Sequence, residues 1–230
     1  MTIEEQRHSA AILSGGVSSS AIYSAALSAA QSAVPQPETV LDFGSGTGQL
    51  LPSLAIRFPK ASLHAIDIMD RPIGLSSNVT WHRGDLNLDA PIGDNRFDLI
   101  CAIEVIEHLE NPRHMLRQIA RILKPGGAAV LSTPNIGSIK SLITVAARGH
   151  HSLFDDSNYP AHITPVGEID LERAGVEANL IRERFFYTDE GSIPKLLSIR
   201  WQSLPIIGSS FLGRRFSDNF GAVFRKPLIP

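Results

Sequence analysis

The stretch VLDFGSGTGQL occupies residues 40–50 and joins a short apolar run to three alternate glycines. Residues 39–43 are preceded by prolines and followed by glycines, as expected for a buried strand of a parallel sheet. Gly44, Gly46 and Gly48 have no side chains, so the backbone can turn tightly and approach a ligand closely. We therefore predict a strand, a ligand-binding turn and the N-terminus of a helix.

Helix and strand patterns alternate on both sides of this loop. We expect helices at residues 18–33, 49–58, 112–123 and 164–174, and strands at 62–68, 79–82, 97–103, 128–131, 181–187 and 222–225, with a helical stretch before the last strand. Such alternation predicts an α/β protein with a doubly wound, mostly parallel seven-stranded sheet. The ligand crevice of these folds lies at the carboxyl ends of the strands.

The chain is expected to form a single domain over residues 1–230. Within it, residues 1–36 are predicted to form an N-terminal helical cover. Residues 134–164 interrupt the alternation with a helical piece at 139–147 and a polar loop. Long insertions in compact folds often serve as lids or binding loops, so we predict a substrate cap here.

The overall composition is that of a globular protein, with 43% hydrophobic and 19% charged residues and a formal net charge of −2. This charge disfavours a nucleic-acid partner. Cys101 is the only cysteine, which excludes an intramolecular disulfide and a cysteine-based metal site. No apolar run is long enough to span a bilayer, and the acidic Glu4 and Glu5 do not suit a targeting peptide. We expect a cytoplasmic protein without a transmembrane segment.

Glycine loops in this position also bind dinucleotides, but those require a third glycine where this chain has Gln49. A nicotinamide oxidoreductase is therefore rejected. Asp42 to Gly48 instead resembles the first motif of class I S-adenosylmethionine-dependent methyltransferases, in which an acidic residue, any residue and alternate glycines follow one another. The resemblance covers about residues 38–135. It implies a Rossmann-like methyltransferase fold and S-adenosylmethionine as cofactor.

Further acidic residues follow the next strands. Asp67 lies 19 residues after Gly48, where a carboxylate can accept hydrogen bonds from both ribose hydroxyls, with Ile68 beside it. By resemblance, Asp85 accepts a hydrogen bond from the adenine amino group and Leu86 packs on the ring. Taken singly, these residues have a structural alternative, because glycines form turns and aspartates cap helices or stabilise loops.

A second cluster follows the fourth strand in the segment CAIEVIEHLENP. On one helical turn, Glu104, Glu107 and His108 would share a face and could bind a divalent cation such as Mg²⁺ or Mn²⁺. The segment resembles those of ubiquinone-biosynthesis O-methyltransferases and small-RNA 2′-O-methyltransferases, which implies metal binding, with His162 as a candidate further histidine. In the alternative, Glu104 lines the cofactor pocket, Glu107 orients a loop, and His108 or His162 acts as a catalytic base or packs in the core.

These features favour an enzyme that O-methylates a small hydroxylated acceptor, such as a quinone-like phenol or a sugar. An RNA ribose 2′-O-methyltransferase and a non-catalytic cofactor-binding module that regulates a partner remain as alternatives. Residues 191–230 carry one acidic residue and six basic ones, which suit a membrane surface or a lipid-like acceptor but also a solvated helix face: Lys195, Arg200, Arg214, Arg215, Arg225 and Lys226.

Overall fold

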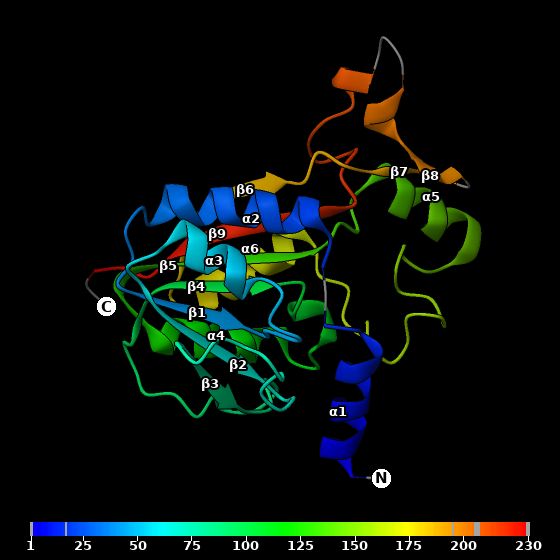
Figure 1. Ribbon diagram of the computed structural model, residues 1–230. Helices are drawn as coiled ribbons and strands as arrows, with labels where there is room; N and C mark the ends of the chain where they lie inside the picture. Colours follow the sequence, from blue (N-terminus) through cyan, green and yellow to red (C-terminus); the bar gives the residue numbers. More distant parts are fainter. Residues whose placement is uncertain (1, 17, 195, 205–207, 229–230) are drawn as a thin grey trace.

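A seven-stranded sheet forms the centre of the protein (Figure 1). The computed structural model describes residues 2–16, 18–194, 196–204 and 208–228. The sheet order is β3-β2-β1-β4-β5-β9-β6, in which neighbours from β3 to β5 are parallel and β9 is antiparallel to both β5 and β6. This arrangement confirms the predicted doubly wound, mostly parallel sheet. The strands are β1 (Thr39–Phe43), β2 (Ser62–Asp67), β3 (Val79–Arg83), β4 (Phe97–Ile103), β5 (Leu123–Pro134), β6 (Ile181–Tyr187) and β9 (Asn219–Arg225).

Apolar side chains on both faces of the sheet explain its position in the core. Successive residues of a strand point to opposite faces, so Val40 packs in one hydrophobic cluster and Leu41 in the other. The Val40 face is covered by α2 (Ser20–Ala33) and α3 (Leu51–Arg57), which Figure 1 shows on the same side of the sheet. The opposite face is covered by α4 (Pro112–Ile122) and α6 (Glu168–Glu177).

Two further helices stand at the side of the molecule towards which β1 points (Figure 1). The first, α1 (Ile3–Leu13), begins with a capping box in which Thr2 and Glu5 bond each other's backbone amides, yet it contains no buried residue. The second, α5 (Ile139–Arg148), begins at the Ser138 cap and ends at Gly149 in the left-handed region. α1 lies in the predicted N-terminal cover and α5 in the predicted cap.

The segment between β6 and β9 differs from its prediction. Its described residues form, instead of a helix, a small antiparallel sheet of β7 (Ser192–Ile193) and β8 (Leu196–Arg200), followed by 3₁₀ turns at Trp201–Ser203 and Gly208–Ser210. Proline and glycine interrupt the apolar run at Pro194 and Gly208, which breaks the continuous backbone bonding that a helix needs. Trp201, Phe211 and Phe216 pack their rings together in place of a helical face.

Two of the basic residues predicted for a membrane contact are paired with carboxylates. Arg225 pairs with Glu183 on the main sheet, and Arg214 pairs with Glu168. Lys195 lies outside the described residues. Across the described part of the chain, no helix combines the length and the apolar character that a membrane crossing requires.

Candidate active site

A cavity of about 560 Å³ opens at the carboxyl ends of the parallel strands. Its walls come from α1, the glycine loop, the ends of β2 and β4, the cap insertion and the β7–β8 segment. Most of the predicted site residues line it: Asp42, Gly44, Gly46, Asp67, Ile68, Asp85, Leu86, Glu104, His108 and His162. Gly48 and Glu107 do not belong to the described residues that form its lining. One cavity therefore joins the predicted cofactor residues to both histidines.

The glycine loop follows β1 in a conformation that requires glycine. Gly44 and Gly46 have φ of +81° and +54°, in the left-handed region that side chains disfavour. A Cβ on Gly46 would lie 2.6 Å from the carbonyl oxygen of Gly16, and one on Gly44 would lie 2.5 Å from the Val105 side chain. Thr47 donates its amide and its hydroxyl to the same Gly16 oxygen, at 3.3 and 3.2 Å. The N-terminal cover is thus fastened directly onto the loop.

Two buried carboxylates flank the loop. Asp42 accepts a 2.7 Å hydrogen bond from the Ser45 hydroxyl, and burial raises its pKa to about 7. Asp67 accepts the Gly46 amide on Oδ2 at 2.7 Å and the Met69 amide on Oδ1 at 2.9 Å. Burial also raises the pKa of Asp67, while these amides favour its charged form. Each Asp67 oxygen keeps acceptor capacity for a ligand, because a carboxylate oxygen can accept about two hydrogen bonds.

Asp85 is engaged by the N-terminal helix, which the sequence did not predict. Its Oδ2 accepts Arg7 Nη1 at 2.7 Å, and its Oδ1 accepts the Asn87 amide at 2.9 Å. Arg7 also binds both carboxylate oxygens of Glu110, at 2.9 and 2.8 Å. Beside this network, the Leu86 side chain is buried and lines the cavity. Arg7 therefore connects α1 to the wall where the adenine was expected.

The prediction that one helical turn carries Glu104, Glu107 and His108 is wrong. Glu104 precedes the 3₁₀ turn Ile106–His108 and has φ of +56°, so its side chain leaves in another direction. Its carboxylate accepts the Ser132 hydroxyl at 2.8 Å and the Asn219 side-chain amide at 2.6 Å. Burial, together with the Glu107 carboxyl, raises the pKa of Glu104 well above its usual range. Glu104 is thus tied to β5 and β9 at the cavity wall.

Glu107, His108 and His162 do come together. Each offers one ligand atom, and these atoms lie within 4.8 Å of one another. Glu107 Oε2 accepts the Thr133 hydroxyl at 3.1 Å, whereas the buried Oε1 has no hydrogen-bond partner among the described residues. Burial raises the pKa of Glu107 to about 8. The sequence analysis grouped Glu104 with Glu107 and His108 and named His162 as a further candidate. The fold shows that His162, and not Glu104, is the third member of the cluster.

Both histidines are held in one tautomer. His108 Nδ1 lies 2.8 Å from the carbonyl oxygen of Ala161, and His162 Nδ1 lies 2.9 Å from that of Leu153. A carbonyl only accepts, so each Nδ1 must donate, which leaves each Nε2 as the acceptor in the neutral ring. Burial lowers the pKa of His108, against the raising effect of the Ala161 and Glu104 carbonyls, and burial and His108 lower that of His162. The ring centroids are 4.9 Å apart.

A family model described as a methyltransferase domain matches residues 21–180, which include β1 to β5 and both histidines. The chain belongs to the class I S-adenosylmethionine-dependent methyltransferases. The match confirms the family that the glycine motif resembled.

Known relatives of the methyltransferase fall in several groups. The biotin biosynthesis bifunctional protein BioHC of Teredinibacter turnerae is 33% identical over 111 residues, covering 42% of this chain and 19% of that protein. The ubiquinone biosynthesis O-methyltransferase of Dechloromonas aromatica is 32% identical over 104 residues, covering 42% of this chain and 44% of that enzyme. These matches thus span less than half of either relative.

The methyltransferase also resembles solved structures of the same fold. The N-methyltransferase NodS from Bradyrhizobium japonicum, solved with S-adenosyl-L-homocysteine, matches with a TM-score of 0.55 and 20% identity. That match covers 89% of this chain and 85% of NodS. At this identity the likeness establishes the fold.

Several residues that line the cavity of the methyltransferase were not identified as site residues in the sequence. Tyr23 of α2 lines the cavity together with the glycine loop, and its hydroxyl accepts a hydrogen bond from the Ser18 amide at 3.0 Å. Three charged residues also line it: Lys140 from α5, Arg200 from β8 and Asp218 from the position before β9. No local motif marks these positions, because only the tertiary fold brings them to the cavity. Asn135, directly after β5, donates to the Arg214 and Ser217 carbonyls.

Proposed function

We propose that this methyltransferase O-methylates a small hydroxylated acceptor, with His108 or His162 receiving the hydroxyl proton. The observation that carries the proposal is the pair of imidazoles in the cavity, each with Nδ1 bound to a carbonyl. Lowered pKa values keep both rings neutral near pH 7, the state in which a histidine can act as a base. The ubiquinone O-methyltransferase relative supports a hydroxyl oxygen as the acceptor atom.

The cofactor is proposed to lie along the glycine loop. Asp67 would accept the two ribose hydroxyls, in addition to the two amides that already fix its carboxylate. Asp42 would lie beside the amino-acid end of S-adenosylmethionine, and Gly44, Gly46 and Gly48 shape the turn that approaches it. Leu86 would contact the adenine and Ile68 the ribose. The Asp85 carboxylate, which already accepts a hydrogen bond from Arg7, would also accept one from the adenine amino group.

The proposed reaction is a single displacement. The acceptor hydroxyl gives its proton to a histidine Nε2 as its oxygen forms a bond to the methyl carbon. The carbon–sulfur bond breaks and its electron pair stays on sulfur, leaving a methyl ether and S-adenosylhomocysteine. Alignment of oxygen, carbon and sulfur within one cavity supplies much of the rate enhancement.

A divalent cation is the alternative to a histidine base, because an Nε2 that binds an ion cannot also receive the hydroxyl proton. Glu107, His108 and His162 fit such an ion, since the buried Glu107 Oε1 has no partner among the described residues and the three ligand atoms already cluster. Two imidazoles and a carboxylate suit Mn²⁺, Fe²⁺ or Zn²⁺ better than Mg²⁺. When bound, such an ion would lower the pKa of an acceptor hydroxyl. Glu104, bonded by Ser132 and Asn219, would remain outside this ligand set.

The test is methyl transfer from radiolabelled S-adenosylmethionine to a panel of catechols, sugars and small RNAs, with EDTA or added Mn²⁺. We expect transfer to a small hydroxylated acceptor and its reduction by about 10²–10⁴-fold in His108→Gln or His162→Gln. His150→Gln, on the neighbouring loop, is the control. Transfer to RNA alone would contradict the proposal in favour of a ribose methyltransferase, and cofactor binding without any transfer would favour a regulatory module.

A further inference from the structure

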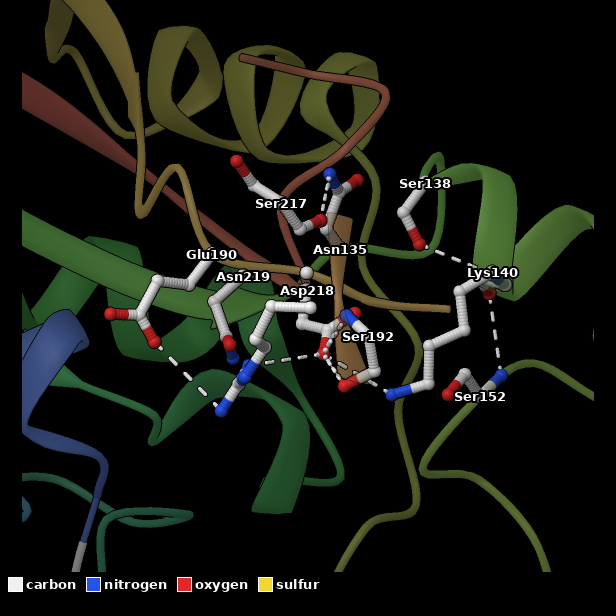
Figure 2. A network of polar contacts seen from close by, with 12 residues as sticks. Asn135, Ser138, Lys140, Ser152, Glu190, Ser192, Ser217, Asp218 and Asn219 are labelled. Carbon is white, nitrogen blue, oxygen red and sulfur yellow. Dashed lines mark hydrogen bonds and ion pairs between the residues drawn. The ribbon is translucent and has the colours of Figure 1, made fainter. Parts of the chain in front are cut away.

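The cavity ends in a polar wall that the proposed chemistry does not use. Lys140 of α5, Ser192 of β7, Arg200 of β8 and Asp218 line this end, and Figure 2 shows the labelled Lys140 and Ser192 converging on Asp218. The wall is built entirely from the cap insertion and the segment between β6 and β9. These parts vary most easily between folds of one family, and they are where binding specificity is usually placed.

Asp218 is the centre of the wall, and a single oxygen makes its contacts. Oδ2 accepts the Ser192 hydroxyl at 2.7 Å and the Ser192 amide at 3.1 Å. The same oxygen lies 3.3 Å from Lys140 Nζ and 3.7 Å from Arg200 Nη1. The short bonds thus come from serine, while Lys140 makes a longer hydrogen bond and Arg200 lies near the outer limit of an ion pair.

Arg200 has donors to spare. Its other ion pair, from Nη2 to Glu190, is 3.8 Å long, and within the described part of the chain its guanidinium makes no hydrogen bond. A guanidinium carries five N–H donors in a planar fork that fits an oxyanion through two parallel bonds. The Lys140 side chain is 14% exposed, and its one hydrogen bond to another described residue is the 3.3 Å bond to Asp218. Both side chains can therefore turn donors towards a ligand.

The charges at the wall leave a local positive excess. Two cations face one carboxylate, Asp218, which is 14% exposed. Glu190 also pairs with Arg200 but lies outside the lining residues, and water and salt screen this pair because the Glu190 and Arg200 side chains are 49% and 45% exposed. Glu104, which also lines the cavity, accepts a hydrogen bond from Asn219, and burial raises the pKa of its carboxyl, which disfavours a negative charge there.

We infer that the acceptor carries an oxyanion group, a carboxylate or a phosphate monoester, which Lys140 and Arg200 bind at this wall. The inference rests on the proposed function, since it assigns the class of acceptor to the same cavity. Asp218 positions the Lys140 and Arg200 side chains, and the oxyanion accepts hydrogen bonds from the N–H groups that Asp218 leaves free. Asp218 and Asn219 are consecutive, and Asn219 holds Glu104, so the anion site adjoins the wall of the reaction centre.

Calorimetric binding of three small probes tests the inference without requiring turnover. Benzoate, phenyl phosphate and neutral benzamide are titrated into protein saturated with S-adenosylhomocysteine. We expect at least one anion to bind about tenfold or more tightly than benzamide, and this preference to fall as salt is raised. Stronger binding of phenyl phosphate indicates a phosphorylated acceptor, and stronger binding of benzoate indicates a carboxylic acid; either supports the inference.

Variants with opposite expected effects separate recognition from folding. Lys140→Gln and Arg200→Gln should each abolish most of the preference, whereas Arg200→Lys should retain part of it. Asp218→Asn keeps an acceptor for Ser192 but removes the competing charge, so anion binding should strengthen about threefold or more. Arg148→Gln, at the exposed end of α5, is the matched control and should change nothing. A purely structural wall would weaken binding in the Asp218 variant as well.

Equal binding of all three probes, absence of anion binding, or an unchanged preference in both glutamine variants would overturn the inference. Failure of the proposed function is distinguishable from these results. It would appear as no binding of S-adenosylhomocysteine, or as no methyl transfer by a protein that nevertheless prefers the anionic probes.

Discussion

Replacing Gly46 by alanine tests how the N-terminal cover and the glycine loop depend on each other. A Cβ at this position would lie 2.6 Å from the Gly16 oxygen and 2.7 Å from the Gly16 Cα, and φ is +54°. Ordinary contact begins near 3.4 Å, so the two backbones would have to separate by roughly 0.8 Å. That movement would weaken both hydrogen bonds from Thr47 to Gly16, at 3.3 and 3.2 Å.

Gly48→Ala is the matched control for the same substitution. Gly48 also has positive φ, +80°, but its added Cβ would make ordinary contacts with side chains: the Leu51 and Leu75 methyl groups at 3.4 Å and Pro72 Cγ at 4.0 Å. Both variants therefore incur the left-handed penalty of about 1–2 kcal/mol. Gly46→Ala adds the two weakened bonds at about 0.5–1.5 kcal/mol each, so we expect it to lose about 1–3 kcal/mol more stability than the control.

Urea denaturation measures the free energy of unfolding of both variants, and calorimetry measures their affinity for S-adenosylmethionine. We expect Gly46→Ala to be the less stable and to bind the cofactor more weakly, because the displaced cover lines the cavity. Equal stability and equal affinity in the two variants would refute the contact between cover and loop as the source of the effect.

Two further predictions concern the buried carboxyl groups and the Arg7 contacts of α1. Folding raises the pKa of Asp42 to about 7 and that of Glu107 to about 8, so the folded protein binds protons that the unfolded chain releases. The two carboxyl groups therefore contribute fully to stability below about pH 4, and this contribution is lost as pH rises through 7–8. Urea denaturation of the cofactor-free protein across pH 5–9 should show this fall, and Asp42→Asn or Glu107→Gln should flatten it; a wild-type curve without slope would count against these assignments. Arg7→Ala removes the bonds to Asp85 and Glu110, and α1 has no buried residue to hold it otherwise. Amide hydrogen exchange in α1 should therefore become faster and cofactor affinity should fall several-fold, whereas unchanged exchange would show that other contacts hold α1.

The sequence predicted the sheet well because the relevant forces are local. The predicted limits of β1, β4 and β6 agree with the structure, and those of α2 and α4 lie within two residues of it. In each case a continuous apolar pattern is bounded by residues that terminate it, such as the glycines after β1 or the Asn111 cap before α4.

The site was harder to predict because its geometry depends on the backbone and on distant segments. The i, i+3, i+4 spacing assumed a helix at Glu104, whose φ of +56° places its carboxylate against Ser132 and Asn219 instead. The cluster of Glu107, His108 and His162 forms because the insertion at residues 134–164 folds back and places His162 next to Glu107. Arg7 and Asp218 reach the cavity only through tertiary contacts, so no spacing in the sequence could reveal them.

The most direct test of the central claim is calorimetric titration of S-adenosylmethionine into the wild type and into Asp67→Ala. Asp70→Ala, in which an exposed carboxylate three residues away is removed, is the control. Two hydrogen bonds to a charged group contribute about 3–6 kcal/mol, so Asp67→Ala should weaken binding by about 100-fold or more while the control binds normally. Absence of binding by the wild type, or equal binding by wild type and Asp67→Ala, would contradict the placement of the cofactor in this cavity.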